Sequence, residues 1–260
     1  MVVIGAGRVG LALKRRSEAR GAEPVSLVDR HGGDEHLRGA QGDPILVAVR
    51  NDDLAAVVAR VPTYRREDLV FVQNGAIRDL LREHSLAAAT RGLLYFAVAS
   101  REAEVVPGLV SPFCGPHGLT MARFMSSLGL EAHAMDWGRF SYYELEKLLW
   151  LATHGLLCQA HSCTVGELVS EHRDALGALV AELCLLGRAA MGVDADPDYV
   201  TQRLVAYSQT IPSWPASVKE WSYRNGWLRS EARRLGVPTP LHDALIDRLQ
   251  VEPPPPGDQE

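Results

Sequence analysis

The stretch MVVIGAGRVG, residues 1–10, places a short β-branched run directly before three spaced glycines. A G-x-G-x-x-G segment between a strand and a helix is typical of a turn that binds a dinucleotide. Gly5 allows the tight turn, Gly7 lets the backbone approach a pyrophosphate, and Gly10 lets the helix pack closely on the strand. The free N–H groups at the helix start would then face the anion. The predicted cofactor-binding turn is therefore Gly5, Ala6, Gly7, Arg8, Val9 and Gly10.

Two charged residues lie at the end of the second predicted strand, 24–29. Asp29 stands where an acid can bind a ribose 2′-hydroxyl, which favours NAD(H). Arg30 comes next, and its guanidinium could bind a 2′-phosphate, which favours NADP(H). The pair leaves NAD(H) and NADP(H) both open, and a plain solvated strand end is the alternative.

Two further apolar runs, 45–49 and 69–72, are typical of parallel strands buried on both faces. The carboxyl ends of parallel strands meet at one edge of a sheet, where ligands bind. We expect one residue from each of four strand ends to line that edge: Gly5, Asp29, Arg50 and Asn74. Helices are predicted at 8–20, 54–60, 77–84 and 120–128, one helical turn at 34–38, and a closing strand at 130–135.

The pattern changes near Asp136, after which no strand is predicted and apolar residues recur at helical spacing. The predicted helices are 145–159, 165–171, 175–191, 198–207, 218–235 and 241–249. The fold class is therefore an α/β Rossmann-like N-terminal domain with a mostly parallel sheet, plus an all-α C-terminal domain. The expected domains are 1–138 and 139–250, followed by a disordered tail, 251–260, rich in proline.

Composition narrows the class of protein further. The 260 residues carry a mild net charge of −5 with no basic cluster, which argues against nucleic acid as a partner. No apolar run approaches a membrane span, and the four cysteines form no C-x-x-C pair. We predict a soluble protein of a reducing compartment such as the cytoplasm, without a metal, and we leave open a transit peptide missing ahead of Met1. A homodimer also stays open, since Trp214, Trp221, Tyr223 and Trp227 suit either an interface or a core.

Five segments in order resemble the ketopantoate reductase family, within the superfamily whose helical domain is similar to that of the 6-phosphogluconate dehydrogenases. They are GAGRVG, ILVAVR, FVQNG, ELEKLLW with the later VGEL, and KEWSYRNGWLRSEARRLGVPTP. The resemblance spans nearly the whole chain, and it implies an NAD(P)-dependent reductase of the 2-dehydropantoate 2-reductase type. Hydride would pass between nicotinamide and a small oxo or hydroxy acid in a cleft between the domains.

The resemblance also implies roles for individual residues. Lys147 takes the place of the catalytic lysine, and Glu220 that of the acid that binds the substrate or the lysine. Asn74 and Ser208 take the places of substrate-binding residues, and Arg50 stands near the nicotinamide. A positioned ammonium suits the reaction because carbonyl reduction develops negative charge on oxygen.

The chain departs from the family at two positions of the helical domain. The family has asparagines four and eight residues after its lysine, where this chain has Leu151 and Gly155. Thr153 and His154 are nearby polar candidates, although a histidine in an apolar helix is more often a core residue. The stretch between Asp29 and Ile45 is also short, so the family's third strand has no counterpart there. These departures favour an alternative hypothesis, a non-catalytic dinucleotide-binding sensor or scaffold.

Overall fold

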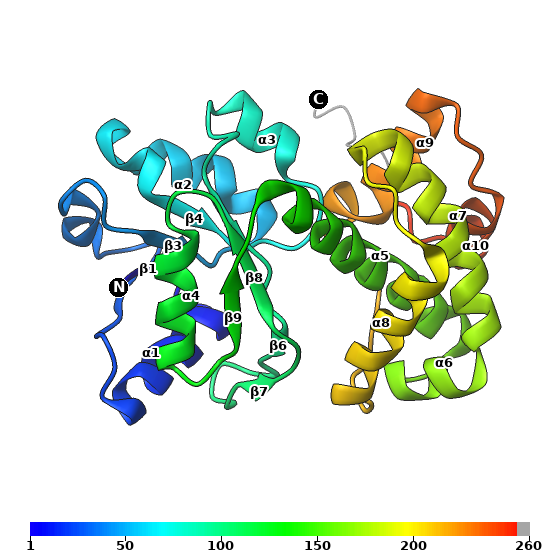
Figure 1. Ribbon diagram of the computed structural model, residues 1–260, viewed down its shortest axis with the longest axis horizontal. Helices are drawn as coiled ribbons and strands as arrows, with labels where there is room; N and C mark the ends of the chain where they lie inside the picture. Colours follow the sequence, from blue (N-terminus) through cyan, green and yellow to red (C-terminus); the bar gives the residue numbers. More distant parts are fainter. Residues whose placement is uncertain (254–260) are drawn as a thin grey trace, which may run out of the picture. The chain divides into compact units, whose positions relative to one another are not determined.

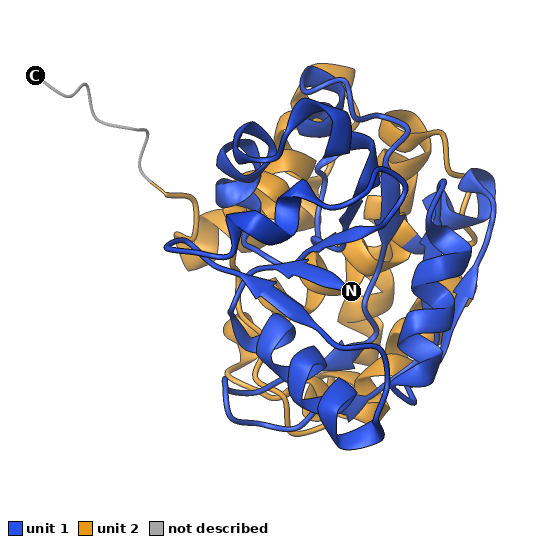
Figure 2. Cartoon of the chain, turned by 90° about the vertical axis from the view of Figure 1, so that its left-hand side faces the viewer, with its two compact units in different colours: residues 1–143 blue, residues 144–260 orange. Residues whose placement is uncertain are grey.

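The computed structural model describes residues 1–253, and the chain divides into two compact units (Figure 2). Unit 1 is Met1–Tyr143 and unit 2 is Glu144–Glu260. Most of the predicted tail, residues 254–260, lies outside the described residues. Within residues 1–253, no helix is both long enough and apolar enough to cross a membrane.

Unit 1 contains a seven-stranded sheet in the order β2-β1-β3-β4-β5-β8-β9 (Figure 1). The strands are β1 Val2–Ile4, β2 Ser26–Val28, β3 Ile45–Val47, β4 Leu69–Phe71, β5 Thr90–Gly92, β8 Ser111–Cys114 and β9 Ala132–Ala134. All neighbours are parallel except β5 and β8, so the predicted mostly parallel sheet is confirmed. β3 and β4 are fully buried, as their continuous apolar runs predict.

The helices of unit 1 are α1 Arg8–Arg20, α2 Leu54–Arg60, α3 Arg78–Glu83 and α4 Gly118–Ser127. Short 3₁₀ turns lie at η1 Asp34–Arg38, η2 Asn51–Asp53 and η3 Thr63–Asp68. α1 ends at Gly21, whose left-handed conformation suits glycine. The described chain between β2 and β3 holds only η1, so the short connection without a further strand is confirmed.

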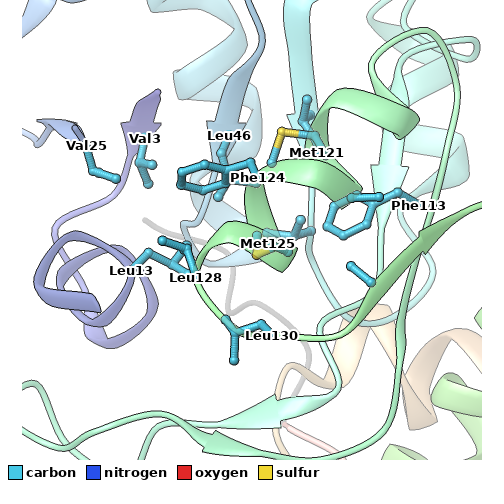
Figure 3. Packing of buried hydrophobic residues seen from close by; sticks show 14 of the residues in the cluster. Val3, Leu13, Val25, Leu46, Phe113, Met121, Phe124, Met125, Leu128 and Leu130 are labelled. Atoms are coloured by element: carbon cyan, nitrogen blue, oxygen red, sulfur yellow. The ribbon is translucent and has the colours of Figure 1, made fainter. Parts of the chain in front are cut away.

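The main apolar core of unit 1 lies between the sheet and helices α1 and α4 (Figure 3). Val3 and Leu46 enter it from the sheet, Leu13 from α1, and Phe124 and Met125 from α4. All five are at least 96% buried. This burial fixes α1 against β1, and it therefore holds the glycine turn that joins them.

Two parts of the sheet differ from the prediction. The strand β5 lies just before the apolar stretch 93–99, which contributes only the short β6, Phe96–Ala97, paired with β7, Val106–Pro107. The segment 111–118, for which no strand is predicted, begins with β8. β5 escapes prediction because Arg91 is polar, although its guanidinium is buried and lies 5.9 Å from the centre of the Phe140 ring.

Unit 2 is helical, as predicted. α5, Trp137–His161, begins in unit 1 and continues into unit 2. The other helices are α6 Val165–Glu171, α7 Arg173–Met191, α8 Pro197–Thr210, α9 Asn225–Leu235 and α10 Pro240–Leu249. α6 begins with a capping box formed by Thr164 and Glu167, and Asp196 caps α8 by accepting a hydrogen bond from the Tyr199 N–H at 2.8 Å.

The helix predicted over 218–235 is wrong in its first third. The chain is irregular up to Glu220, which has a left-handed φ of 48°, and a short 3₁₀ turn, η4 Trp221–Tyr223, follows. α9 begins only at Asn225. Gly226 is needed there because a Cβ atom would lie 2.7 Å from the Trp221 carbonyl oxygen. The Asn-Gly pair therefore starts a helix and does not kink one.

Candidate functional site

At two of the three glycines in the first turn, a side chain would collide with the protein backbone. Gly5 has a φ of 119°, and a Cβ atom on it would lie 2.5 Å from the Ala48 carbonyl oxygen. A Cβ atom on Gly10 would collide with the carbonyl oxygen of Gly5. The turn therefore closes on itself and on β3 only because these positions lack side chains.

Gly7 differs, because no atom of the described chain lies within 4 Å of the position a Cβ atom would take. It is the N-cap of α1, no side chain caps the helix there, and the first turn carries no acid. Free N–H groups and open space at a helix start fit an anion such as a pyrophosphate. Of its neighbours, Val9 packs against the core, while Arg8 is exposed and its guanidinium lies 3.4 Å from the Ala99 carbonyl oxygen.

Asp29 and Arg30 follow β2 at the same edge of the sheet, and they have different partners. One carboxylate oxygen of Asp29 accepts hydrogen bonds from the N–H groups of His31 and Gly32, at 2.7 and 2.8 Å. The His31 bond is the main cause of the lowered pKa of Asp29, so the exposed side chain is an anion at neutral pH. Arg30 instead pairs with Asp53 at 3.1 Å.

Polar side chains also gather after β3 and β4. The Arg50 side chain is exposed and has no partner among residues 1–253, while the Arg50 carbonyl accepts a hydrogen bond from the Asp53 N–H at 3.1 Å. Asn51, which sequence reasoning missed, is buried and donates from its side-chain amide to the Asn74 carbonyl at 2.8 Å. Gln73, also missed, donates to the carbonyl oxygens of Val47 and Val49 at 2.8 and 3.2 Å.

Two buried amide oxygens remain without a donor at this point. They are Oε1 of Gln73 and Oδ1 of Asn74, and no described residue donates to either. Parallel pairing of β1 with β2 and β3, and of β3 with β4, places the four predicted strand ends at one edge, as expected. Unit 1 therefore offers open backbone donors, an anion and unpaired amide acceptors along the same edge.

Lys147 is the central charged residue of the candidate site in unit 2. It lies on α5 and is 97% buried. Its ammonium lies 4.2 Å from the centre of the Tyr207 ring, on α8, and 5.4 Å from that of the Trp150 ring. Burial lowers the pKa of Lys147 to about 7, opposed by the Glu146 carboxylate and assisted by the Arg224 guanidinium.

A buried hydrogen-bond network continues from the same faces of α5 and α8. Trp150 donates its ring N–H to the Ser208 hydroxyl at 3.0 Å, and Nε2 of His154 lies 2.9 Å from the same hydroxyl. The rings of Trp150 and His154 stack at 4.8 Å. Burial lowers the pKa of His154 to about 3, so this imidazole is neutral. His154 is therefore a core residue whose ring nitrogens are used inside the protein.

The acids near Lys147 are each paired with an arginine. Glu146 is buried and binds the guanidinium of Arg203, with one N–H to oxygen distance of 3.1 Å. Glu220, for which the sequence predicts contact with the substrate or the lysine, forms an ion pair with Arg224. Arg224 is itself 8% exposed. The charges around the lysine thus come from two ion pairs, one in α5 and α8 and one before α9.

The two positions where the family has asparagine are occupied differently here. Leu151 is partly buried on α5. At Gly155 a Cβ atom would lie 3.2 Å from the carbonyl carbon and oxygen of Ser217 and 3.3 Å from the Val218 nitrogen. The backbone of residues 217–218 therefore occupies space next to α5 that a longer side chain would need.

Of the predicted site residues, Lys147 and Ser208 lie on neighbouring helices, and the Trp150 side chain contacts both. Glu220 is paired with Arg224, whose charge acts on Lys147. Sequence reasoning missed Trp150, Tyr207 and Arg224. Helical spacing could have predicted Trp150, which lies one turn after Lys147. Tyr207 and Arg224 could not be predicted in this way, because they come from segments far along the chain. Among residues 1–253, no cluster of three acids, histidines or cysteines suits a metal ion.

Comparison with known proteins finds a match in sequence for one part of the chain and in fold for nearly all of it. Residues 139–252 match the family model described as the ketopantoate reductase PanE/ApbA C terminal. No curated protein matches the chain. Among solved structures, D-mandelate dehydrogenase with NADH and anilino(oxo)acetate is 18% identical, with a TM-score of 0.75 and coverage of 96% of this chain and 97% of that one.

Two other solved structures with the same fold are ketopantoate reductases. The PanE/ApbA family enzyme from Ralstonia eutropha JMP134 is 19% identical, with a TM-score of 0.73 and coverage of 96% and 98%. The dimeric enzyme from Staphylococcus aureus is 16% identical, with a TM-score of 0.70 and coverage of 96% of both chains. The predicted resemblance is confirmed: residues 139–252 match the model of the ketopantoate reductase C terminal, and the chain shares the fold of solved ketopantoate reductases.

Proposed function

We propose that the protein is an NAD(P)-dependent oxidoreductase that transfers hydride between a nicotinamide and a small oxo or hydroxy acid. The observation that carries this proposal is Lys147, a buried ammonium held against Tyr207 with its pKa lowered to about 7. It lies in the part of the chain that matches the ketopantoate reductase family. Strongly shifted groups of this kind concentrate at catalytic sites.

Unit 1 would hold the cofactor. Gly7 and the start of α1 suit its pyrophosphate, and Asp29 suits a ribose hydroxyl. Since Asp29 is an anion and Arg30 is already paired with Asp53, we propose a preference for NADH over NADPH. Arg50 and the unpaired amide oxygen of Asn74 would contact the nicotinamide side or the substrate. When bound, the cofactor supplies or accepts the hydride.

Lys147 would act as the acid and base of the reaction. As hydride reaches the carbonyl carbon, the oxygen gains negative charge, which a nearby ammonium stabilises. Lys147 then gives a proton to that oxygen, and in the reverse direction it takes the proton from the alcohol. A pKa of about 7 suits this role because both protonation states are available at neutral pH.

The solved relatives support this class of substrate. The D-mandelate dehydrogenase structure holds NADH and anilino(oxo)acetate, which is an oxo acid derivative. The Staphylococcus aureus relative is dimeric, which supports the proposal of a homodimer here.

A second candidate function is a dinucleotide-binding sensor or scaffold without catalysis. It is favoured by Gly155, where the backbone of residues 217–218 takes the space of the family's asparagine. In this alternative the glycine turn still binds a dinucleotide, and Lys147 is a core residue without a catalytic role.

Binding and turnover separate the two candidates. Calorimetric titration with NADH and NADPH should show binding, tighter for NADH, and a panel of 2-oxo acids should then be reduced with that cofactor. The control is Gly7→Ala, which should lose binding without loss of folding, because the added Cβ atom meets only open space. Binding without turnover of any oxo acid, at any concentration tested, would leave the sensor or scaffold as the function.

A further inference from the structure

Arg224 is a second buried cation beside Lys147. Its side chain is 10% exposed, and it lies directly before α9. Its charge contributes to the lowered pKa of Lys147, which indicates that the two cations are near each other. Each of the two cations also lies near a carboxylate of the chain, Lys147 near Glu146 and Arg224 against Glu220.

The hydrogen bonds of Arg224 are incomplete. The guanidinium makes one side-chain hydrogen bond, from Nη2 to Glu220. Its Nε is buried and has no acceptor among residues 1–253. A buried N–H without a partner costs about 1–3 kcal/mol, so such groups usually mark a missing water, ion or ligand.

Ser208 is not available for the role that the family resemblance implies, which is binding of the substrate carboxylate. The residue is fully buried, and its hydroxyl lies 2.8 Å from the Leu204 carbonyl, 3.0 Å from the Trp150 ring nitrogen and 2.9 Å from His154. A hydroxyl has one proton and two lone pairs, so these three neighbours use its capacity. A substrate carboxylate therefore needs another partner in unit 2.

We propose that Arg224 binds the carboxylate of the substrate, so that the enzyme selects oxo acids over neutral carbonyl compounds. This inference rests on the proposed function. Arg224 is paired with Glu220 on one side, and its buried Nε is the donor that remains for a substrate carboxylate. The planar guanidinium can donate two hydrogen bonds to a carboxylate, from Nε and one terminal nitrogen, while its other terminal nitrogen stays bonded to Glu220.

The test compares a 2-oxo acid with its methyl ester, which lacks the charge but keeps the carbonyl. Arg224→Gln should raise KM for the acid about 10- to 100-fold, the scale of a lost charged hydrogen bond. It should change KM for the ester less than about threefold and leave kcat nearly unchanged. Arg224→Lys keeps the charge and should recover part of the loss. Arg234→Gln, which removes an exposed charge on the helix that follows, α9, is the control and should change neither KM.

Each outcome decides one of the two proposals. An equal loss for acid and ester, or no loss for the acid, overturns the role of Arg224. If the wild-type protein reduces neither compound, the proposed function fails, and calorimetry with oxamate still tests Arg224 in the presence of NADH. Oxamate binding that Arg224→Gln abolishes supports the carboxylate site, and binding that survives the substitution, or no binding by the wild type, overturns it.

Discussion

The glycine turn of unit 1 and the lysine cluster of unit 2 are built in opposite ways. The turn, Gly5–Gly10, works through missing side chains: two glycines let the backbone close on itself, and the third leaves open space at a helix start. The cluster works through large side chains, with Lys147 buried against Tyr207 and Trp150. The first is largely a local property of six consecutive residues, whereas the second needs two helices whose residues lie about sixty positions apart.

This difference explains how each region responds to change. The glycine turn depends on space around its backbone, so one added methyl group is enough to disturb its folding or its binding of a ligand. A buried charge cluster depends on desolvation and pairing, so it responds to pH and to charge substitutions. Three predictions test the contrast, beginning with the largest effect.

Replacement of Lys147 should have the largest effect. Lys147→Met removes the proton donor and should lower kcat for reduction about 10²- to 10⁴-fold without loss of cofactor binding. In the wild type, reduction requires the ammonium, so kcat should fall as pH rises through about 7, while oxidation of the alcohol should fall as pH drops below it. Steady-state kinetics from pH 5 to 9 in both directions measures this.

Lys14 provides the matched control, because it is partly exposed on α1 and, within residues 1–253, forms an ion pair only with Glu18. Lys14→Met should leave kcat and the pH profile unchanged. A Lys147→Met enzyme with wild-type kcat, or with the same inflection near pH 7, would show that another group transfers the proton.

Two alanine substitutions in the turn should separate folding from binding. Gly10→Ala forces a Cβ atom into the Gly5 carbonyl, and it should lower the free energy of unfolding by about 1–3 kcal/mol. Gly7→Ala should leave that free energy unchanged but weaken NADH binding about tenfold or more, since it obstructs the approach of the anion. Urea denaturation and calorimetric titration measure the two effects. If Gly7→Ala binds NADH as well as the wild type, the turn does not hold the pyrophosphate.

The third prediction concerns two buried histidines of unit 2, whose effect on stability builds up gradually with pH. Burial lowers the pKa of His154 to about 3 and that of His242 to about 4. Below pH 6.5 the unfolded chain takes up protons that the folded histidines do not, so stability is lost as pH falls from 6.5 towards 4. The free energy of unfolding should drop by roughly 1 kcal/mol per pH unit for each histidine.

Urea denaturation at pH 7 and at pH 5 measures this slope. His242→Gln should reduce it by about half, while the same substitution at the exposed His133 should not. Equal stability of the wild type at both pH values would mean that these histidines are already charged in the folded protein.

Much of the fold could be predicted because local rules decide it. The helix at 8–20, the turn at 34–38 and the helix at 54–60 match the structure, since glycine, proline and apolar spacing mark their ends. β5 and the start of α9 could not be predicted. Arg91 is a polar residue in a buried strand, so the apolar pattern that predicts such strands is missing at β5. Glu220 has a left-handed backbone conformation that interrupts an otherwise helical pattern of residues.

The sequence by itself determined the two-part organisation, the glycine turn and the place of Lys147 within a recognisable motif. These follow from residue order and spacing, which are local. Only the tertiary structure decided the surroundings of that lysine: Tyr207 beneath it, Ser208 occupied by Trp150 and His154, and Arg224 beside it with an unpaired N–H. Burial and pairing depend on which helices pack together, and that information is spread over the whole helical unit.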